Sequence, residues 1–161
     1  MFMETKNEIT DKRKIKNAVC EVEIIYKRPI IAEPQKILSS SDAEKILRLV
    51  YDANRIDLKE FFFVVLLARN NTVLGVAQIS MGSTTGTIVS PKEIFQLAIK
   101  ANACSILISH NHPSGNLKPS KEDIEITTRI KDGTKLLDFV LIDHLILTSE
   151  GYYSFADAGF I

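Results

Sequence analysis

Two histidines and one aspartate stand at a spacing that suits a metal site. His110 and His112 are two residues apart, directly after a short apolar segment that favours a buried strand. Residues i and i+2 of a strand face the same side, so both imidazoles are expected to project together from the strand end. Pro113 and Gly115 predict a loop, and Asp123 lies beyond it. If the loop folds back, these side chains form the three-ligand set of a catalytic zinc, with an open fourth position.

Such a site would activate water for hydrolysis. Zinc lowers the pKa of a bound water to about 7 and so supplies hydroxide at neutral pH. A general base must then accept the proton, and a carboxylate from another element can do so. Glu60, at the start of the apolar run Phe61 to Ala68, is the best placed acid in the upstream half. Histidine and carboxylate ligands do not select zinc uniquely, so another first-row ion stays open.

Each of these residues also has an ordinary structural interpretation. A His-x-His pair often arises by chance, and Ser120 with Asp123 fits the Ser-x-x-Asp pattern of helix capping. The two roles of the aspartate need not compete, because a capping carboxylate can also reach a metal. Glu60 alone is typical of a strand-edge acid that faces solvent. His144 is expected to sit with its polar atoms satisfied in or near the sheet, and Cys104 to be a small buried core residue.

The elements that would position these residues are short helices and strands. Three segments indicate helix starts: Ser41-Asp42-Ala43-Glu44, Ser90-Pro91-Lys92-Glu93 and Ser120-Lys121-Glu122-Asp123. Helical spacing continues to Asn54 after the first, and the last helix is expected to reach roughly Leu137. Strands are predicted over 60–68, 72–80, 104–109, 139–148 and 152–155, the first two as an antiparallel pair. The pattern predicts an α+β fold resembling an α-β-α sandwich, in which helices cover a mixed sheet.

The N-terminal quarter differs from the rest of the chain. Residues 1–39 are expected to be a tail and extended connector, with a solvated tail over 1–17 and an alternating strand over 18–27. Residues 40–161 are expected to form the domain, with a loop or further short strand near Gly82 and Gly86. The chain start lacks the apolar core of a secretory signal.

Composition narrows the classes of function. The 161 residues include 20 Lys+Arg and 20 Asp+Glu, so the formal net charge is zero. A zero net charge argues against a sequence-independent grip on nucleic acid, although a local basic face stays open. The longest apolar run is far short of the about 20 residues of a membrane helix, so we expect no membrane association and a cytoplasmic location. Cys20 and Cys104 alone make neither a disulfide framework nor a cysteine zinc cluster.

The joint spacing resembles the JAMM signature of the JAB1/MPN metalloprotease superfamily, whose architecture is cytidine-deaminase-like. The pattern consists of His110-x-His112, seven residues and Ser120-x-x-Asp123, with a glutamate opening an earlier strand. Within that superfamily the chain is similar to the RadC family over roughly residues 40–161, in the segments 110–116, 90–93, 143–145 and 151–155. The resemblance implies that His110, His112 and Asp123 hold one zinc ion. It also implies that Glu60 handles the proton of the water and that Ser120 helps to stabilise the oxyanion.

Two functions follow as hypotheses. The first is a zinc-dependent metallohydrolase that cleaves a peptide or isopeptide bond in a peptide or protein substrate. The alternative is a non-catalytic metal-binding adaptor associated with DNA repair or mobile elements. The basic residues Lys12, Arg13, Lys14 and Lys16 give the adaptor only weak support, because acids flank them and the net charge is zero. The sequence does not reveal the substrate or the oligomeric state.

Overall fold

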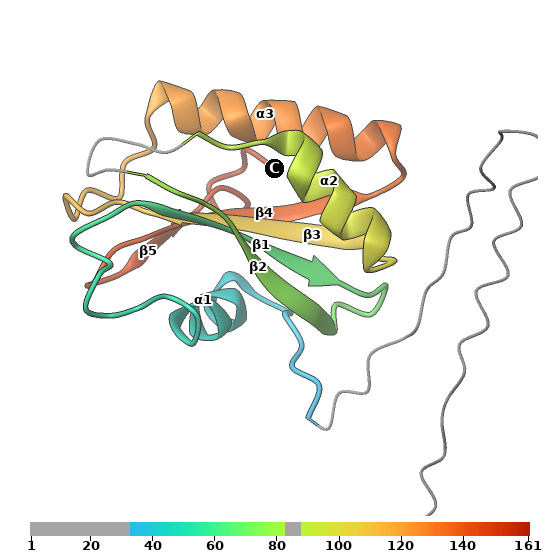
Figure 1. Ribbon diagram of the computed structural model, residues 1–161, viewed down its shortest axis with the longest axis horizontal. Helices are drawn as coiled ribbons and strands as arrows, with labels where there is room; N and C mark the ends of the chain where they lie inside the picture. Colours follow the sequence, from blue (N-terminus) through green and yellow to red (C-terminus); the bar gives the residue numbers. More distant parts are fainter. Residues whose placement is uncertain (1–32, 83–87) are drawn as a thin grey trace, which may run out of the picture.

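A mixed sheet between two helix layers organises the chain in the computed structural model, which describes residues 33–82 and 88–161 (Figure 1). In chain order the elements of these ranges are α1 (Ser40–Arg48), β1 (Phe61–Leu67), β2 (Val73–Met81), α2 (Pro91–Lys100), β3 (Ser105–Asn111), α3 (Lys121–Leu136), β4 (Val140–Leu147) and β5 (Tyr152–Ser154). The strand order is β2-β1-β3-β4-β5, with α1 on one face and α2 and α3 on the other. The β3–β4 pair is parallel and the other pairs are antiparallel. The predicted α+β class is confirmed.

Burial on both faces explains the continuous apolar run of β1. Every residue of its sequence FFFVVLL is buried. Because successive side chains point to opposite faces, the strand divides its residues between two cores. Phe61, Phe63, Val65 and Leu67 belong to the core on the α1 side, and Phe62, Val64 and Leu66 belong to the core that includes Ile94, Ala98 and Ile130 of α2 and α3. β1 and its neighbour β3 are therefore packed on both faces, and they can hold residues at their ends in fixed positions.

The helix starts agree with the sequence for α2 and α3 but not for α1. Ser90 and Ser120 cap α2 and α3 as predicted. The N-cap of α1 is Ser39 rather than Ser41, and its hydroxyl accepts a hydrogen bond from the backbone N–H of Asp42 at 3.2 Å. The apolar stripe fixes which face of a helix is buried but not which of several adjacent serines begins it. The helix also ends at Arg48, well before Asn54.

Cys104 is exposed, so its prediction as a core residue was wrong. It precedes the first residue of β3, and its backbone bonds to Leu67 and Val140 on the neighbouring strands. Its buried neighbours Ala103 and Ser105 point the other way. Alternation along an extended segment at the end of the sheet therefore turns the thiol outward.

Several sequence predictions fall outside the described residues. These are the tail over 1–17, the strand over 18–27 and the segment around Gly86. Of the expected connector, Lys36 forms an isolated antiparallel bridge with Thr72, and Ile37 is buried in the core on the α1 side. None of the helices in the described ranges has the length and apolar content needed to cross a membrane.

Candidate metal centre

The imidazoles of His110 and His112 meet at the C-terminal end of β3. His110 is the penultimate residue of this strand and is 2% exposed. The backbone N–H of His112 donates to Leu147 of β4 at 2.9 Å, which continues the parallel pairing past the strand end. The two Nε2 atoms lie 3.0 Å apart. The i, i+2 spacing thus puts both rings on the same side, as the sequence predicted.

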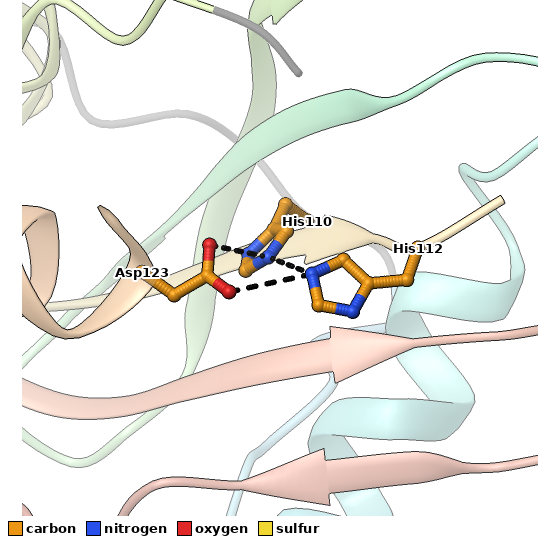
Figure 2. Close-up of side chains that lie close together, drawn as sticks. All are labelled: His110, His112 and Asp123. Carbon is orange, nitrogen blue, oxygen red and sulfur yellow. Dashed lines mark hydrogen bonds and ion pairs between the residues drawn. The ribbon is translucent and has the colours of Figure 1, made fainter. Parts of the chain in front are cut away.

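Asp123 reaches the same point from the first turn of α3 (Figure 2). Its Oδ1 lies 3.0 Å from Nε2 of His110, and its Oδ2 lies 3.3 Å from Nε2 of His112. The carboxylate also completes a capping box: Oδ2 accepts from the backbone N–H of Ser120 at 2.7 Å, and the Ser120 hydroxyl accepts from the backbone N–H of Asp123 at 3.0 Å. One carboxylate therefore caps the helix and faces both imidazoles.

When its ring is neutral, His112 has no hydrogen to share with Asp123. Nδ1 of His112 lies 2.6 Å from the carbonyl oxygen of Asn116, which can only accept, so Nδ1 carries the ring hydrogen. In the neutral ring Nε2 is then a lone pair directed at Asp123, which also only accepts. Only the protonated ring can donate from Nε2 to Asp123, and this hydrogen bond therefore raises the pKa of His112. Burial raises the pKa of Asp123, but the bonds to His110 and His112 outweigh it and hold that pKa well below its usual range. A positive charge among these atoms is strongly favoured.

A divalent cation fits this set of donors. His110, His112 and Asp123 each offer a ligand atom, and these atoms lie within 4.8 Å of one another. Two ligands of one tetrahedral zinc, each bound at about 2.0–2.1 Å, lie about 3.3 Å apart. The separations of 3.0 to 3.3 Å between the nearest atoms are close to that value. These three residues are the ones that would hold the ion.

A cavity of about 780 Å³ opens in front of the three side chains. Glu60 and Ser120 line it together with His110, His112 and Asp123, so all five residues predicted from the sequence border one space. Glu60 is half-buried, and its backbone carbonyl accepts from Gly82 at 2.9 Å. The pKa of His112 is raised mainly by the hydrogen bond to Asp123, and to smaller extents by Asn116 and by the charge of Glu60, whereas burial of the ring lowers it.

Asn111 is a positioning residue that sequence reasoning missed. It lies between the two histidines, so strand alternation turns its side chain to the opposite face. There it is fully buried, and its amide donates to the carbonyls of Ile56 at 2.6 Å and Lys59 at 2.8 Å and accepts from the N–H of Phe61 at 2.7 Å. The peptide groups on both sides of Glu60 are thereby fixed to the strand that carries the imidazoles. An asparagine inside an apolar strand was the available signal, because a buried amide requires partners.

His144 lies inside the sheet with both ring nitrogens bonded, as expected. Its Nε2 is 2.8 Å from Nδ1 of His110, and its Nδ1 is 2.6 Å from the hydroxyl oxygen of Thr127. Burial, followed by the charge of His110, lowers the pKa of His144 well below its ordinary value. The sequence did not reveal its contact with a candidate ligand, because that contact depends on the parallel register of β3 and β4.

Fold and site together define a JAB/MPN-like domain with a candidate His-His-Asp metal-binding group. Residues 37–160 match the family model described as the RadC-like JAB domain. The chain belongs to this family, which confirms the resemblance seen in the sequence.

Curated relatives are named UPF0758 protein. One from Desulfitobacterium hafniense is 39% identical over 134 residues, which is 83% of this chain and 55% of the relative. One from Flavobacterium johnsoniae is 40% identical over 129 residues, covering 80% of this chain and 55% of the relative. A relative from Fusobacterium nucleatum is 36% identical over 161 residues, covering 97% of this chain and 67% of the relative. The chain thus spans little more than half the length of the first two.

Proposed function

We propose that this domain is a metal-dependent hydrolase that cleaves a peptide or isopeptide bond in a peptide or protein substrate. The observation that carries the proposal is the convergence of His110, His112 and Asp123 at 3.0 to 3.3 Å, beside a cavity that a further carboxylate also lines. A bound zinc or similar ion would polarise the scissile carbonyl and lower the pKa of a water molecule to about 7.

Glu60 is the proton carrier in this proposal. It accepts the proton of the attacking water and passes it to the leaving amine, as a positioned carboxylate does in general acid–base catalysis. Two features support the assignment: Glu60 borders the same cavity as the ligands, and Asn111 holds the backbone on both sides of it. The backbone on both sides of the base is therefore hydrogen-bonded to the strand that carries His110.

Ser120 is the donor to the developing oxyanion. Its oxygen accepts from the backbone of Asp123, and this leaves the hydroxyl hydrogen to be donated into the cavity that Ser120 lines. Donors fixed before the reaction stabilise the charge that appears in the transition state. The capping box thus holds both a ligand and an oxyanion donor at the start of one helix.

The size and lining of the cavity are compatible with a peptide substrate. Its volume of about 780 Å³ is within the range of roughly 300–1,000 Å³ common for ligand sites. Apolar side chains of Phe62, Val89 and Ile126 line it beside the polar groups. Such a mixed wall suits the backbone and side chains that flank a scissile amide.

The test combines metal analysis with a search for cleavage. Zinc content is measured on the purified chain before and after chelation, and turnover is followed by mass spectrometry on a mixture of peptides and isopeptide-linked conjugates. Asp123→Ala should lose the ion, whereas Glu60→Gln should keep the ion and lose turnover. Glu150→Gln, on an exposed turn, is the matched control for charge loss and should change neither.

Two results would contradict the proposal. Full activity of the Glu60→Gln variant would remove this residue as the proton carrier. A metal-loaded wild-type chain that cleaves none of these amides would favour the non-catalytic adaptor.

A further inference from the structure

A third histidine lies behind the candidate ligands, in the interior of the domain. His144, on β4, is fully buried, and its ring stacks on Phe155 with 4.6 Å between centroids and 11° between planes. One ring nitrogen meets Nδ1 of His110, and the other meets the hydroxyl of Thr127 on α3. The ring thus bridges the strand that carries one ligand and the helix that carries Asp123.

The hydrogen positions in this series of hydrogen bonds follow from the backbone carbonyl of Asp123, which can only accept. The backbone carbonyl of Asp123 accepts from the Thr127 hydroxyl, so the single hydroxyl hydrogen is committed to it. The Thr127 oxygen must then accept from Nδ1–H of His144. A neutral imidazole carries one hydrogen, so Nε2 of His144 accepts from Nδ1–H of His110. Nε2 of a neutral His110 is thereby left as a lone pair on the side of the candidate metal site.

We infer that His144 and Thr127 are positioning residues that fix His110 in its metal-binding tautomer and tie it to the backbone of Asp123. The circuit is the buried series of hydrogen bonds from His110 through His144 and Thr127 to the backbone carbonyl of Asp123. It links two of the three candidate ligands, and each of its bonds has a defined donor and acceptor. Partners behind a ligand orient it, and their loss typically weakens metal binding by about 10–100-fold. The inference rests on the metal site of the proposed function and not on the reaction.

Packing alone does not account for these two residues. The faces of the His144 ring lie against Phe155 and Phe62, so apolar packing alone would not call for ring nitrogens here. Thr127 is 3% exposed, a setting in which valine has the same shape. Buried polar groups are unfavourable unless hydrogen-bonded, and here the donors and acceptors match one another. The isosteric substitution Thr127→Val therefore separates packing from the hydrogen-bonded circuit.

Thr127→Val is the central test, and Thr128→Val is its matched control. The hydroxyl of Thr128 makes the same kind of bond to the carbonyl four residues back, at 2.8 Å to Ile124, but it is exposed. The dissociation constant for Zn²⁺ is measured on the full chain by competition with a chromophoric chelator. We expect about 10-fold weaker binding or more for Thr127→Val and a change of less than about 2-fold for Thr128→Val. His144→Phe, which keeps the ring stacking, should weaken binding as Thr127→Val does.

Unchanged zinc affinity in both Thr127→Val and His144→Phe would overturn the inference. A second readout needs neither metal nor activity: long-range ¹H–¹⁵N spectra of the metal-free wild-type chain near pH 8 report the tautomer of each histidine. The hydrogen of His144 is expected on Nδ1, and finding it on Nε2 would overturn the circuit even if the variants failed to fold. A wild-type chain that binds no divalent ion overturns the metal site and, with it, the role of His144 and Thr127 in metal binding. Metal binding that responds to Thr127→Val, without cleavage of any amide, contradicts only the reaction.

Discussion

Replacing Asn111 with leucine should destabilise the domain strongly while leaving the metal ligands in place. The side chain is fully buried and makes three hydrogen bonds of 2.6 to 2.8 Å. Leucine has a similar shape but leaves the carbonyls of Ile56 and Lys59 and the N–H of Phe61 without this partner. A buried polar group that loses its partner costs about 1–3 kcal/mol. Allowing for relaxation and the gain from a more apolar side chain, we expect a loss of about 3–5 kcal/mol.

Urea denaturation of the metal-free chain measures this loss. With a slope of about 2 kcal/mol/M, the midpoint should fall by roughly 1.5–2.5 M. Asn70→Leu is the matched control, because Asn70 is exposed and its side chain accepts one local bond, from Thr72 at 3.3 Å. Its midpoint should move by less than about 0.5 M. Zinc affinity of folded Asn111→Leu should stay within about 10-fold of wild type, less than the usual loss of a ligand partner. An unchanged midpoint, or loss of zinc as complete as in Asp123→Ala, would refute the assignment of Asn111 to the backbone around Glu60.

Three further predictions concern the pH dependence of metal binding and the stability of the fold. The pKa of His112 is raised above 6.5, so its ion pair with Asp123 stabilises the metal-free fold below pH 6.5 and is lost as the pH rises through the folded-state pKa. Metal binding needs the neutral ring, so the zinc-induced rise in melting temperature should grow with pH across this range. A constant rise between pH 5.5 and 8.5 would contradict this prediction. Ser154→Ala should lower the free energy of unfolding by about 1.5–3 kcal/mol, because it removes the hydroxyl that donates to buried Asp143 at 2.6 Å. A change below about 0.5 kcal/mol in urea denaturation would count against this role. Arg48→Met should lower the free energy of unfolding by about 1–3 kcal/mol in the same assay, because Arg48 donates to the carbonyls of Thr148 and Gly151 and so joins α1 to the β4–β5 turn. Stability equal to that of wild type would mean that solvent replaces both bonds.

The sequence was sufficient for the features that depend on local rules. Strand periodicity put His110 and His112 on one side, and the Ser-x-x-Asp pattern put Asp123 in the first turn of a helix, as the structure has them. The order of helices and strands followed from apolar runs and capping residues. These signals need only the chain neighbours of each residue, so one sequence carries them.

The features that sequence reasoning missed depend on contacts between distant segments. The hydrogen bonds of Asn111 span 50 to 55 residues, and those of His144 depend on strand register and on the placement of α3. The start of α1 at Ser39 and the exposure of Cys104 are decided by how each element meets the sheet. Residue type gives no direct measure of such contacts, although a buried asparagine or histidine indicates that partners must exist.

The double engagement of Asp123 links the candidate metal site to the start of α3. Histidine or cysteine at this position would offer a different donor to the ion, yet each would give up the hydrogen bond from the backbone of Ser120 that closes the capping box. A substitution that changed the metal preference would therefore also destabilise the first turn of α3, and other contacts in the fold would have to offset that loss. A carboxylate at the third position of the helix can serve both purposes, and in this chain that carboxylate belongs to Asp123.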